Sequence, residues 1–161
     1  MRIYIESTIP SYVAARPARD LLQAARQQLT RDWWDFQREK HVLFTSQVVL
    51  DEIAFGENAM AQLRLDLLVG VPLLQVTEEV KELARRVLGS GLLPVTADRD
   101  ATHIALASAY EMDILLSWNC RHIANAAIQG RLRKLMESAG FTLPVICTPE
   151  ELMESDDEQG D

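Results

Sequence analysis

The amino-acid sequence predicts an α/β layered fold with a mostly parallel central sheet. Short runs rich in β-branched and aliphatic residues alternate with longer stretches of helical periodicity, which is the pattern of α/β proteins. Residues 114–117 (ILLS) are nearly all apolar, as expected for a strand that is buried on both faces of a parallel sheet. The length of 161 residues, of which 48% are hydrophobic and 25% are charged, fits one globular domain.

The first half of the chain predicts two strands and several helices. Apolar residues recur at helical spacing from Leu21 to Phe36 and predict one long helix. Ser46 is a favourable N-cap for the helix after the second strand, and Gly56 ends that helix. The predicted strands span residues 3–5 and 41–45, and the predicted helices are a short one opened by residues 7–10 and others over residues 18–40, 47–55 and 57–69.

The second half predicts three strands and three helices, followed by a capping sequence. Thr148, Pro149 and Glu151 match a capping box with proline at the first helical position. Pro144 is tolerated at the edge of a sheet, where the last strand is therefore expected. The predicted strands span residues 73–76, 114–117 and 143–146, and the predicted helices span residues 77–88, 98–111 and 123–139.

Negative charge is concentrated at the C-terminus. The formal net charge is −8, and seven of the 24 acidic residues lie in residues 150–161, which contain no lysine or arginine. The other 17 acidic residues nearly balance the 16 basic residues, so the net charge argues only weakly against a nucleic-acid partner. We expect a domain over residues 1–153 and an acidic, disordered tail over residues 154–161. Mimicry of nucleic acid by this tail is the alternative interpretation.

The sequence also bears on the cellular compartment. No apolar run reaches the roughly 18 residues of a membrane span, and the sequence starts directly with the first predicted strand, so no signal peptide is expected. Cys120 and Cys147 lack the Cys-x-x-Cys spacing of many metal sites. Two free thiols in a reducing compartment are the simplest account, and we expect a cytoplasmic protein.

Four polar residues lie at or near the carboxyl ends of predicted strands. Glu6 directly follows the first strand, and Asn119 lies two residues past the fourth. Glu52 is about two turns into the helix after the second strand, and Asp100 is in the first turn of the helix before the fourth. Sites in open parallel sheets form beyond these strand ends, so the four side chains are expected to converge if their strands are neighbours.

Such a cluster is typical of a divalent metal site. Carboxylate oxygens suit Mg²⁺ or Mn²⁺, and such an ion activates water and neutralises the charge of a phosphodiester. Each acid also has a structural interpretation, which is the better one for any acid taken singly. Glu52 beside Asp51 fits the exposed side of a helix, and Asp100 is a first-turn acid that the helix dipole favours.

Several segments taken together change this balance. They are residues 3–12 (IYIESTIPSY), 100–105 (DATHIA) and 113–125 (DILLSWNCRHIAN), and residues 48–53 (VVLDEI) supply the middle acid. In these segments the chain resembles the PIN-domain family, and more closely the bacterial VapC-type toxins, over about residues 1–153. The resemblance implies a three-layer α/β/α sandwich with a mostly parallel central sheet and a ribonuclease that depends on Mg²⁺ or Mn²⁺.

The resemblance also implies a set of catalytic and metal-binding residues. The family's first three acidic positions match Glu6, Glu52 and Asp100, and the fourth position, often Asp, is Asn119 here. Glu6 stands where Asp is usual and is one methylene longer. Asn119 offers an amide oxygen but no negative charge. With three carboxylates in place of four, weaker binding of a divalent ion is expected.

The implied function is that of a metal-dependent endoribonuclease, and the toxin of a type II toxin–antitoxin pair is the more specific expectation. The expected partners are an RNA substrate, an antitoxin protein and a second copy of the chain, with Trp34 as a candidate dimer contact; no membrane partner is expected. The alternative is a catalytically weak PIN domain that binds RNA or protein without cutting it. Asn119 and the acidic net charge favour this alternative.

Other residues near the predicted site have two interpretations each. Ser7 and Thr8 either orient Glu6 through hydrogen bonds or cap the first helix. His103, one helical turn after Asp100, is interpreted as a structural histidine with satisfied hydrogen bonds. His122 and Arg121 either contact substrate phosphate or pack in the fold, and Trp118 either lines the site or fills the core. The arginines 16, 19, 26, 31 and 38 either contact an RNA backbone or form a solvated face. Asp113 and Trp33 are expected to be structural.

Overall fold

The computed structural model describes residues 1–153, and the predicted acidic tail over residues 154–161 lies outside the described residues. The described chain forms a parallel five-stranded sheet in the order β3-β2-β1-β4-β5. The predicted mostly parallel sheet is confirmed, and every described strand pair is parallel. The strands are β1 (Arg2–Ile5), β2 (Val42–Ser46), β3 (Leu73–Leu74), β4 (Ile114–Leu116) and β5 (Val145–Cys147).

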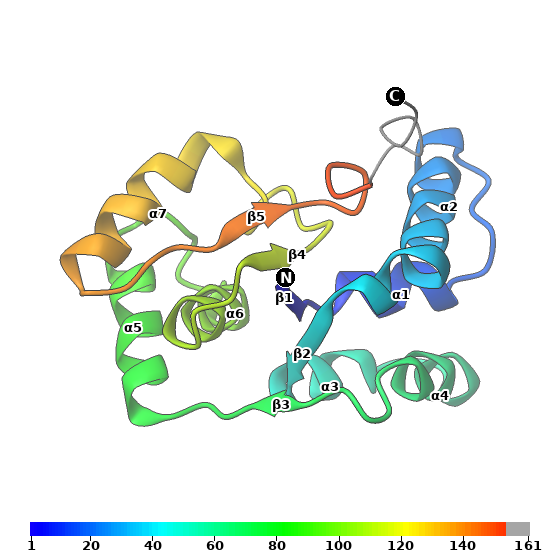
Figure 1. The fold of residues 1–161 in the computed structure, drawn as a ribbon, viewed down its shortest axis with the longest axis horizontal. Helices are drawn as coiled ribbons and strands as arrows, with labels where there is room; N and C mark the ends of the chain where they lie inside the picture. Colours follow the sequence, from blue (N-terminus) through cyan, green and yellow to red (C-terminus); the bar gives the residue numbers. More distant parts are fainter. Residues whose placement is uncertain (154–161) are drawn as a thin grey trace.

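Helices cover both faces of this sheet. Figure 1 shows α1, α2 and α4 on one side of the strands and α5, α6 and α7 on the other. This arrangement confirms the predicted three-layer α/β/α sandwich. No helix in residues 1–153 is both long enough and apolar enough to cross a membrane. The helices are α1 (Thr8–Ala14), α2 (Leu21–Phe36), α3 (Gln47–Ile53), α4 (Asn58–Leu67), α5 (Glu78–Gly89), α6 (Asp98–Ala109) and α7 (Ala126–Ser138).

The central strand β1 is the best-buried part of the sheet. Ile3, Tyr4 and Ile5 are all 0% exposed, and Ile3 pairs with residues of both β2 and β4. Helices on both faces leave no exposed side for a polar residue, which explains why these strands are apolar without alternation. Full burial of one such side chain stabilises the fold by about 1.5–3 kcal/mol.

The order in which strands are added to the sheet changes direction at β1. From β1 the chain moves outward through β2 to β3, and it then crosses to β4 on the opposite side of β1. The carboxyl ends of β1 and β4 therefore lie side by side where the two halves of the sheet diverge. Crevices at such switch points are the usual ligand sites of open α/β sheets.

Two long helices begin later than the sequence pattern predicts. Helix α2 starts at Leu21 rather than at residue 18, because the Asp20 side chain caps it by accepting a hydrogen bond from Gln23 N at 2.8 Å. Its predicted last turn is instead the 3₁₀ helix η1 (Arg38–Lys40). Helix α7 starts at Ala126 rather than at residue 123, because Asn125 is its N-cap. The loop before α7 is thereby longer than expected.

The Glu151 half of the predicted capping box at Thr148 forms, without a regular helix after it. Glu151 Oε2 accepts hydrogen bonds from Thr148 N at 2.8 Å and from Thr148 Oγ1 at 3.3 Å. The following backbone bonds join Leu152 N to Pro149 O and Met153 N to Glu150 O, so each spans three residues. Residues 149–152 are therefore turns, and the helix that the capping sequence predicted does not form there.

The two tryptophans of α2 are both in the core. Trp33 is 0% exposed, as predicted. Trp34 is 4% exposed, and the Arg38 guanidinium lies 5.0 Å from the centre of its ring. The expectation that Trp34 provides a dimer contact is therefore wrong, because its ring is covered by its own chain.

Candidate functional site

Glu6 begins the candidate site at the carboxyl end of β1. Its side chain is 2% exposed and accepts hydrogen bonds at both carboxylate oxygens. Ser7 Oγ donates to Oε1 at 2.6 Å, while Thr8 N and Thr8 Oγ1 donate to Oε2 at 3.0 and 2.5 Å. Of the two interpretations left open for Ser7 and Thr8, the structure shows hydrogen bonds that orient Glu6. Ser7 occupies the N-cap position of α1, but its side chain makes no capping bond.

The neighbouring strand β4 completes the support of Glu6. Ser117 Oγ donates to Glu6 Oε2 at 2.8 Å, and Trp118 N donates to Thr8 Oγ1 at 2.8 Å. The carboxylate is thus held by donors from two adjacent strand ends. Sequence reasoning treated Ser117 only as the end of a strand. The sequence feature that could have indicated its role is its position directly after the apolar strand β4. That strand pairs with β1, which ends just before Glu6.

Glu52 reaches the site from α3. Its Oε1 lies 2.5 Å from His103 Nε2, and its Oε2 accepts a longer hydrogen bond of 3.4 Å from Ser7 Oγ. Because Ser7 also donates to Glu6, this hydroxyl lies between the two carboxylates. The predicted convergence of Glu6 and Glu52 is therefore found in the structure.

His103 belongs to the same cluster. Its ring is 0% exposed, and Nδ1 lies 2.7 Å from the Tyr4 hydroxyl, which in turn lies 2.7 Å from Ser46 Oγ. Both ring nitrogens are hydrogen-bonded, so the predicted satisfied histidine is confirmed. One ligand-type atom from each of Glu6, Glu52 and His103 lies within 4.8 Å of the others, a grouping that could hold a metal ion. Sequence reasoning did not include His103 in the metal set, although its spacing of three from Asp100 places both on one helix face.

The carboxylates of the cluster raise the pKa of the His103 imidazole. Burial lowers the pKa of His103, but the hydrogen bond with Glu52 and the charges of Glu6, Glu52 and Asp100 raise it more, so that the pKa lies above its ordinary value of 6.5. Burial raises the pKa of Tyr4 far above its ordinary value, against a hydrogen bond with Ser46 that lowers it. Tyr4 is therefore a neutral phenol at any physiological pH.

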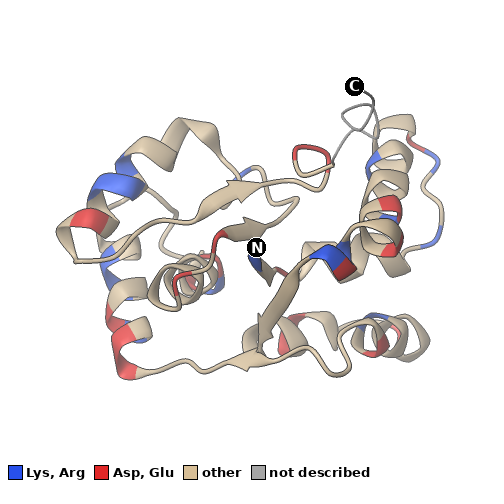
Figure 2. Cartoon of the chain, in the orientation of Figure 1, with Lys and Arg blue, Asp and Glu red and all other residues tan. Residues whose placement is uncertain are grey.

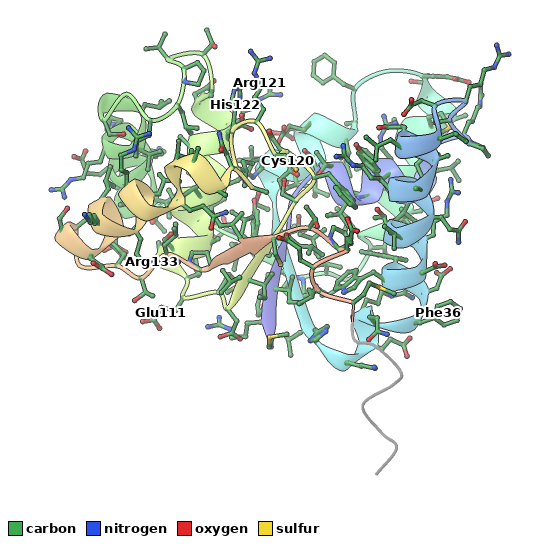
Figure 3. The ribbon with its side chains drawn as sticks, turned by 90° about the horizontal axis from the view of Figure 1, so that it is seen from above. Phe36, Glu111, Cys120, Arg121, His122 and Arg133 are labelled. Atoms are coloured by element: carbon green, nitrogen blue, oxygen red, sulfur yellow. The ribbon has the colours of Figure 1, made fainter. Side chains whose placement is uncertain are left out.

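Asp100 and Asn119, the other predicted ligands, are joined by His122. Asp100 Oδ2 lies 2.7 Å from His122 Nδ1, and Asn119 Oδ1 accepts a hydrogen bond of 3.1 Å from His122 N. Figure 3 shows His122 with Cys120 and Arg121 on the loop after β4, at the end of the molecule opposite Phe36. The structure thus places the predicted residues as two pairs, Glu6 with Glu52 and Asp100 with Asn119.

The donor set fits a divalent ion. Carboxylate oxygens are the ligands that Mg²⁺ and Mn²⁺ share, and imidazole nitrogen suits transition metals better than Mg²⁺. The groups that contact Glu52 and Asp100 as ion-pair partners in residues 1–153 are the histidines 103 and 122. The buried Glu6 carboxylate is held by neutral hydroxyl and amide donors. These donors bring no positive charge, so the charge of Glu6 is balanced by the nearby His103 when that ring is protonated and by a cation when one binds.

The arginines that were candidates for RNA contact are largely engaged in the fold. Arg31 donates to Val13 O and Ala15 O, and the Arg26 guanidinium lies 5.2 Å from the centre of the Trp118 ring. Figure 2 shows both signs of charge on α2, α4 and α5. These helices therefore present mixed charges rather than a basic surface.

The structure shows structural contacts for Asp113 and decides the open case of Trp118. Asp113 Oδ2 accepts a hydrogen bond of 2.6 Å from Arg2 N at the start of β1, which confirms its structural role. Trp118 is 6% exposed, and its indole donates to Thr30 Oγ1 at 2.7 Å, so it fills the core. Cys120 is exposed and Cys147 is buried, and both are free thiols, as predicted.

Comparison with known proteins agrees with this architecture. No protein-family profile and no curated protein sequence matches the chain. The fold is similar to that of a chain in the crystal structure of VapBC2 from Rickettsia felis bound to a DNA fragment from their promoter, with a TM-score of 0.53 and 13% sequence identity over 92% of this chain and 98% of that one. Similarity at 13% identity shows the fold and not the activity. The fold is PIN-like.

Proposed function

We propose that the protein is a metal-dependent endoribonuclease of the PIN type. The observation that carries the proposal is the meeting of Glu6 and Glu52 at the switch point of a PIN-like sheet, with Glu6 2% exposed and held by neutral donors. A carboxylate that is buried without a lysine or arginine partner is costly unless a cation joins it. A site at this point of the fold is where α/β proteins bind ligands.

In this proposal Glu6, Glu52 and Asp100 hold Mg²⁺ or Mn²⁺. Asn119 Oδ1 already accepts one hydrogen bond from His122 N, and its second lone pair is the one assigned to the ion. When bound, the ion would supply Lewis-acid activation of water and neutralisation of phosphate charge. Ser7, Thr8 and Ser117 keep the Glu6 carboxylate in one orientation.

The toxin role and the partners rest on the likeness to VapBC2. The proposed substrate is RNA, and the proposed protein partners are an antitoxin and a second copy of the chain. His122 and Arg121, on the loop after β4, are the residues we assign to the substrate phosphate. His122 is oriented for this role by its contact with Asp100.

The second candidate function is a PIN domain that binds RNA or protein without cutting it. A specific observation favours it, because Asp100 and Asn119 are both engaged with His122 rather than grouped with Glu6 and Glu52. In that case the site needs no ion, and Asp100 and Asn119 serve to hold the loop after β4 against α6.

Calorimetric titration with Mn²⁺ and cleavage of RNA with and without EDTA test the proposal. We expect the wild type to bind Mn²⁺, to cut RNA, and to stop cutting when EDTA is added. Asp100→Asn should lose both properties. Asp98→Asn is the matched control, because Asp98 is an exposed acid in the same first turn of α6.

Full cleavage by folded Asp100→Asn, or cleavage that persists in EDTA, would contradict the nuclease. RNA binding without cleavage and without a metal requirement would instead support the binding module.

A further inference from the structure

Tyr4, His103 and Ser46 form a buried hydrogen-bonded chain that ends on Glu52. Ser46 Oγ and the Tyr4 hydroxyl are 2.7 Å apart, the Tyr4 hydroxyl and His103 Nδ1 are 2.7 Å apart, and His103 Nε2 is 2.5 Å from Glu52 Oε1. Ser46, Tyr4 and His103 are each 0% exposed. Water is therefore excluded from the contacts among Ser46, Tyr4 and His103, whereas Glu52 at the end of the series is partly exposed.

These hydrogen bonds connect three secondary-structure elements around the Glu52 carboxylate. Ser46 is the N-cap of α3, where it accepts a hydrogen bond from Val49 N, and Glu52 lies further along the same helix. Tyr4 is on β1, two residues before Glu6, and His103 is on α6, three residues after Asp100. The contacts thus start and end on α3 and fix its position relative to the two elements that bear the other acids.

The donor to Glu52 is the same in either protonation state of the imidazole. A carboxylate only accepts hydrogen bonds, so the Nε2 atom of His103 must bear the hydrogen that points at Glu52. Tyr4 and Ser46 adapt at the other end of the ring, because a hydroxyl both donates and accepts. The orientation of Glu52 therefore depends on the presence of the imidazole and not on its charge.

The geometry also separates the two oxygens of Glu52. Within residues 1–153, Oε1 contacts His103, whereas Oε2 has the longer contact of 3.4 Å with Ser7 Oγ, the hydroxyl that also donates to Glu6. A carboxylate held at one oxygen presents the other in a defined direction. Here that direction is toward Glu6.

We propose that Tyr4 and His103 are positioning residues of the candidate metal site, which fix Glu52 so that its free oxygen faces Glu6. The inference rests on the proposed function, because it assigns these residues to the same ion. Metal-binding carboxylates are commonly oriented by such outer contacts, and loss of one contact typically weakens metal affinity by about 10- to 100-fold. His103 acts through Glu52 and is not itself a ligand.

Calorimetric titration of the 161-residue protein with Mn²⁺ tests this role. His103→Leu, which removes the donor, should weaken Mn²⁺ binding by roughly 10- to 100-fold. His103→Gln should restore binding to within a few-fold of the wild type, because its amide nitrogen reaches about the same place as Nε2 and can donate to Glu52. Tyr4→Phe should fall between these variants.

Tyr110→Phe is the matched control for loss of a tyrosine hydroxyl. Tyr110 is the C-cap of α6, and its hydroxyl donates to Gln75 O at 2.9 Å rather than to a group that contacts Glu6 or Glu52. It should bind Mn²⁺ as the wild type does. Thermal unfolding in EDTA checks that each variant is folded, and Tyr4→Phe with His103→Gln decides the matter if His103→Leu does not fold.

Three outcomes would overturn the inference. Equal Mn²⁺ affinity in the wild type, Tyr4→Phe and His103→Leu would remove the positioning role while leaving the proposed function in place. Imidazole nitrogen coupling in the pulsed EPR spectrum of the Mn²⁺-loaded wild type that is lost in Mn²⁺-loaded His103→Gln would make His103 a direct ligand. No Mn²⁺ binding by the wild type would end both the inference and the proposed function.

Discussion

Glu6 and Glu52 meet at one site but are held there by different kinds of contact. The donors to Glu6 are hydroxyl and amide groups from its own strand end and from the neighbouring β4. The short contact of Glu52 is with an imidazole from α6, a helix far away in the sequence. Asp100 on α6 is likewise held by an imidazole, that of His122.

The donors to Glu6 keep the same charge over the physiological pH range, whereas the donor to Glu52 is a side chain that can titrate. Hydroxyl and backbone N–H donors keep their protons throughout the physiological range, so the support of Glu6 should not change with pH. The support of Glu52 involves a histidine, the side chain that most readily changes charge between pH 5 and 8.

The largest effect is expected from Glu6→Gln. The substitution keeps the size of the side chain but removes the buried negative charge, and its amide group cannot accept all the donors that converge on the carboxylate. Mn²⁺ affinity should fall by roughly 100-fold or more, at least as much as for loss of an outer contact. Calorimetry measures this, and Glu79→Gln, an exposed acid of α5, is the control. Unchanged affinity would remove Glu6 from the site.

Ser117→Ala should destabilise the fold by a smaller amount. The buried Glu6 carboxylate loses one charge-assisted donor, which is worth about 1.5–3 kcal/mol of unfolding free energy. Urea denaturation in EDTA measures this loss, which should be the same at pH 6 and pH 8. Ser138→Ala, which removes an exposed hydroxyl that donates to Leu135 O, is the control. A loss no larger than that of the control would contradict the assigned support.

The metal-free protein should lose stability as the pH rises. His103 binds its proton more tightly in the folded chain than in the unfolded chain, where its pKa is near 6.5. The resulting stabilisation is complete below 6.5 and is lost as the pH rises through the raised pKa of the folded state, at no more than about 1.4 kcal/mol per pH unit for one proton. Urea denaturation of the wild type and of His103→Gln, in EDTA and across this range, measures the difference. Equal pH profiles for the two proteins would contradict the raised pKa.

The smallest effect concerns the two cysteines, which lie beyond β4 and in β5. Cys120 is exposed on the loop after β4, whereas Cys147 is buried and burial raises the pKa of its thiol to about 11. Iodoacetamide at pH 8 should therefore modify Cys120 and leave Cys147 unmodified in the folded protein, as mass spectrometry of the peptides can show. Equal modification of both would mean that β5 opens readily at the sheet edge.

The contrast between Glu6 and Glu52 also separates contacts that can be predicted from the sequence from contacts that cannot. The support of Glu6 by Ser7 and Thr8 was predictable, because the three residues are consecutive after an apolar strand. The contact of His103 with Glu52 was not, since it depends on how α6 packs against α3. Tyr4 shows the same limit, because a tyrosine in a buried strand gives no sign of the hydrogen bonds that its hydroxyl makes.

The differences between the predicted and the observed fold have local causes. The predicted helix starts near residues 18 and 123 followed apolar spacing, whereas the side-chain caps of Asp20 and Asn125 set the observed starts. Trp34 was placed outside the core because it is adjacent to Trp33, yet Arg38 covers its ring. The later start of α7 matters for the site, because it frees the loop on which Asn119 and His122 lie.

A crystal of the protein soaked in Mn²⁺, with diffraction data collected at the manganese absorption edge, tests the central claim most directly. The account predicts an anomalous peak between the carboxylates of Glu6 and Glu52, with Asp100 turned toward it or linked to it through water. A fully ordered site with no peak, or a peak only at exposed acids elsewhere on the surface, would contradict it.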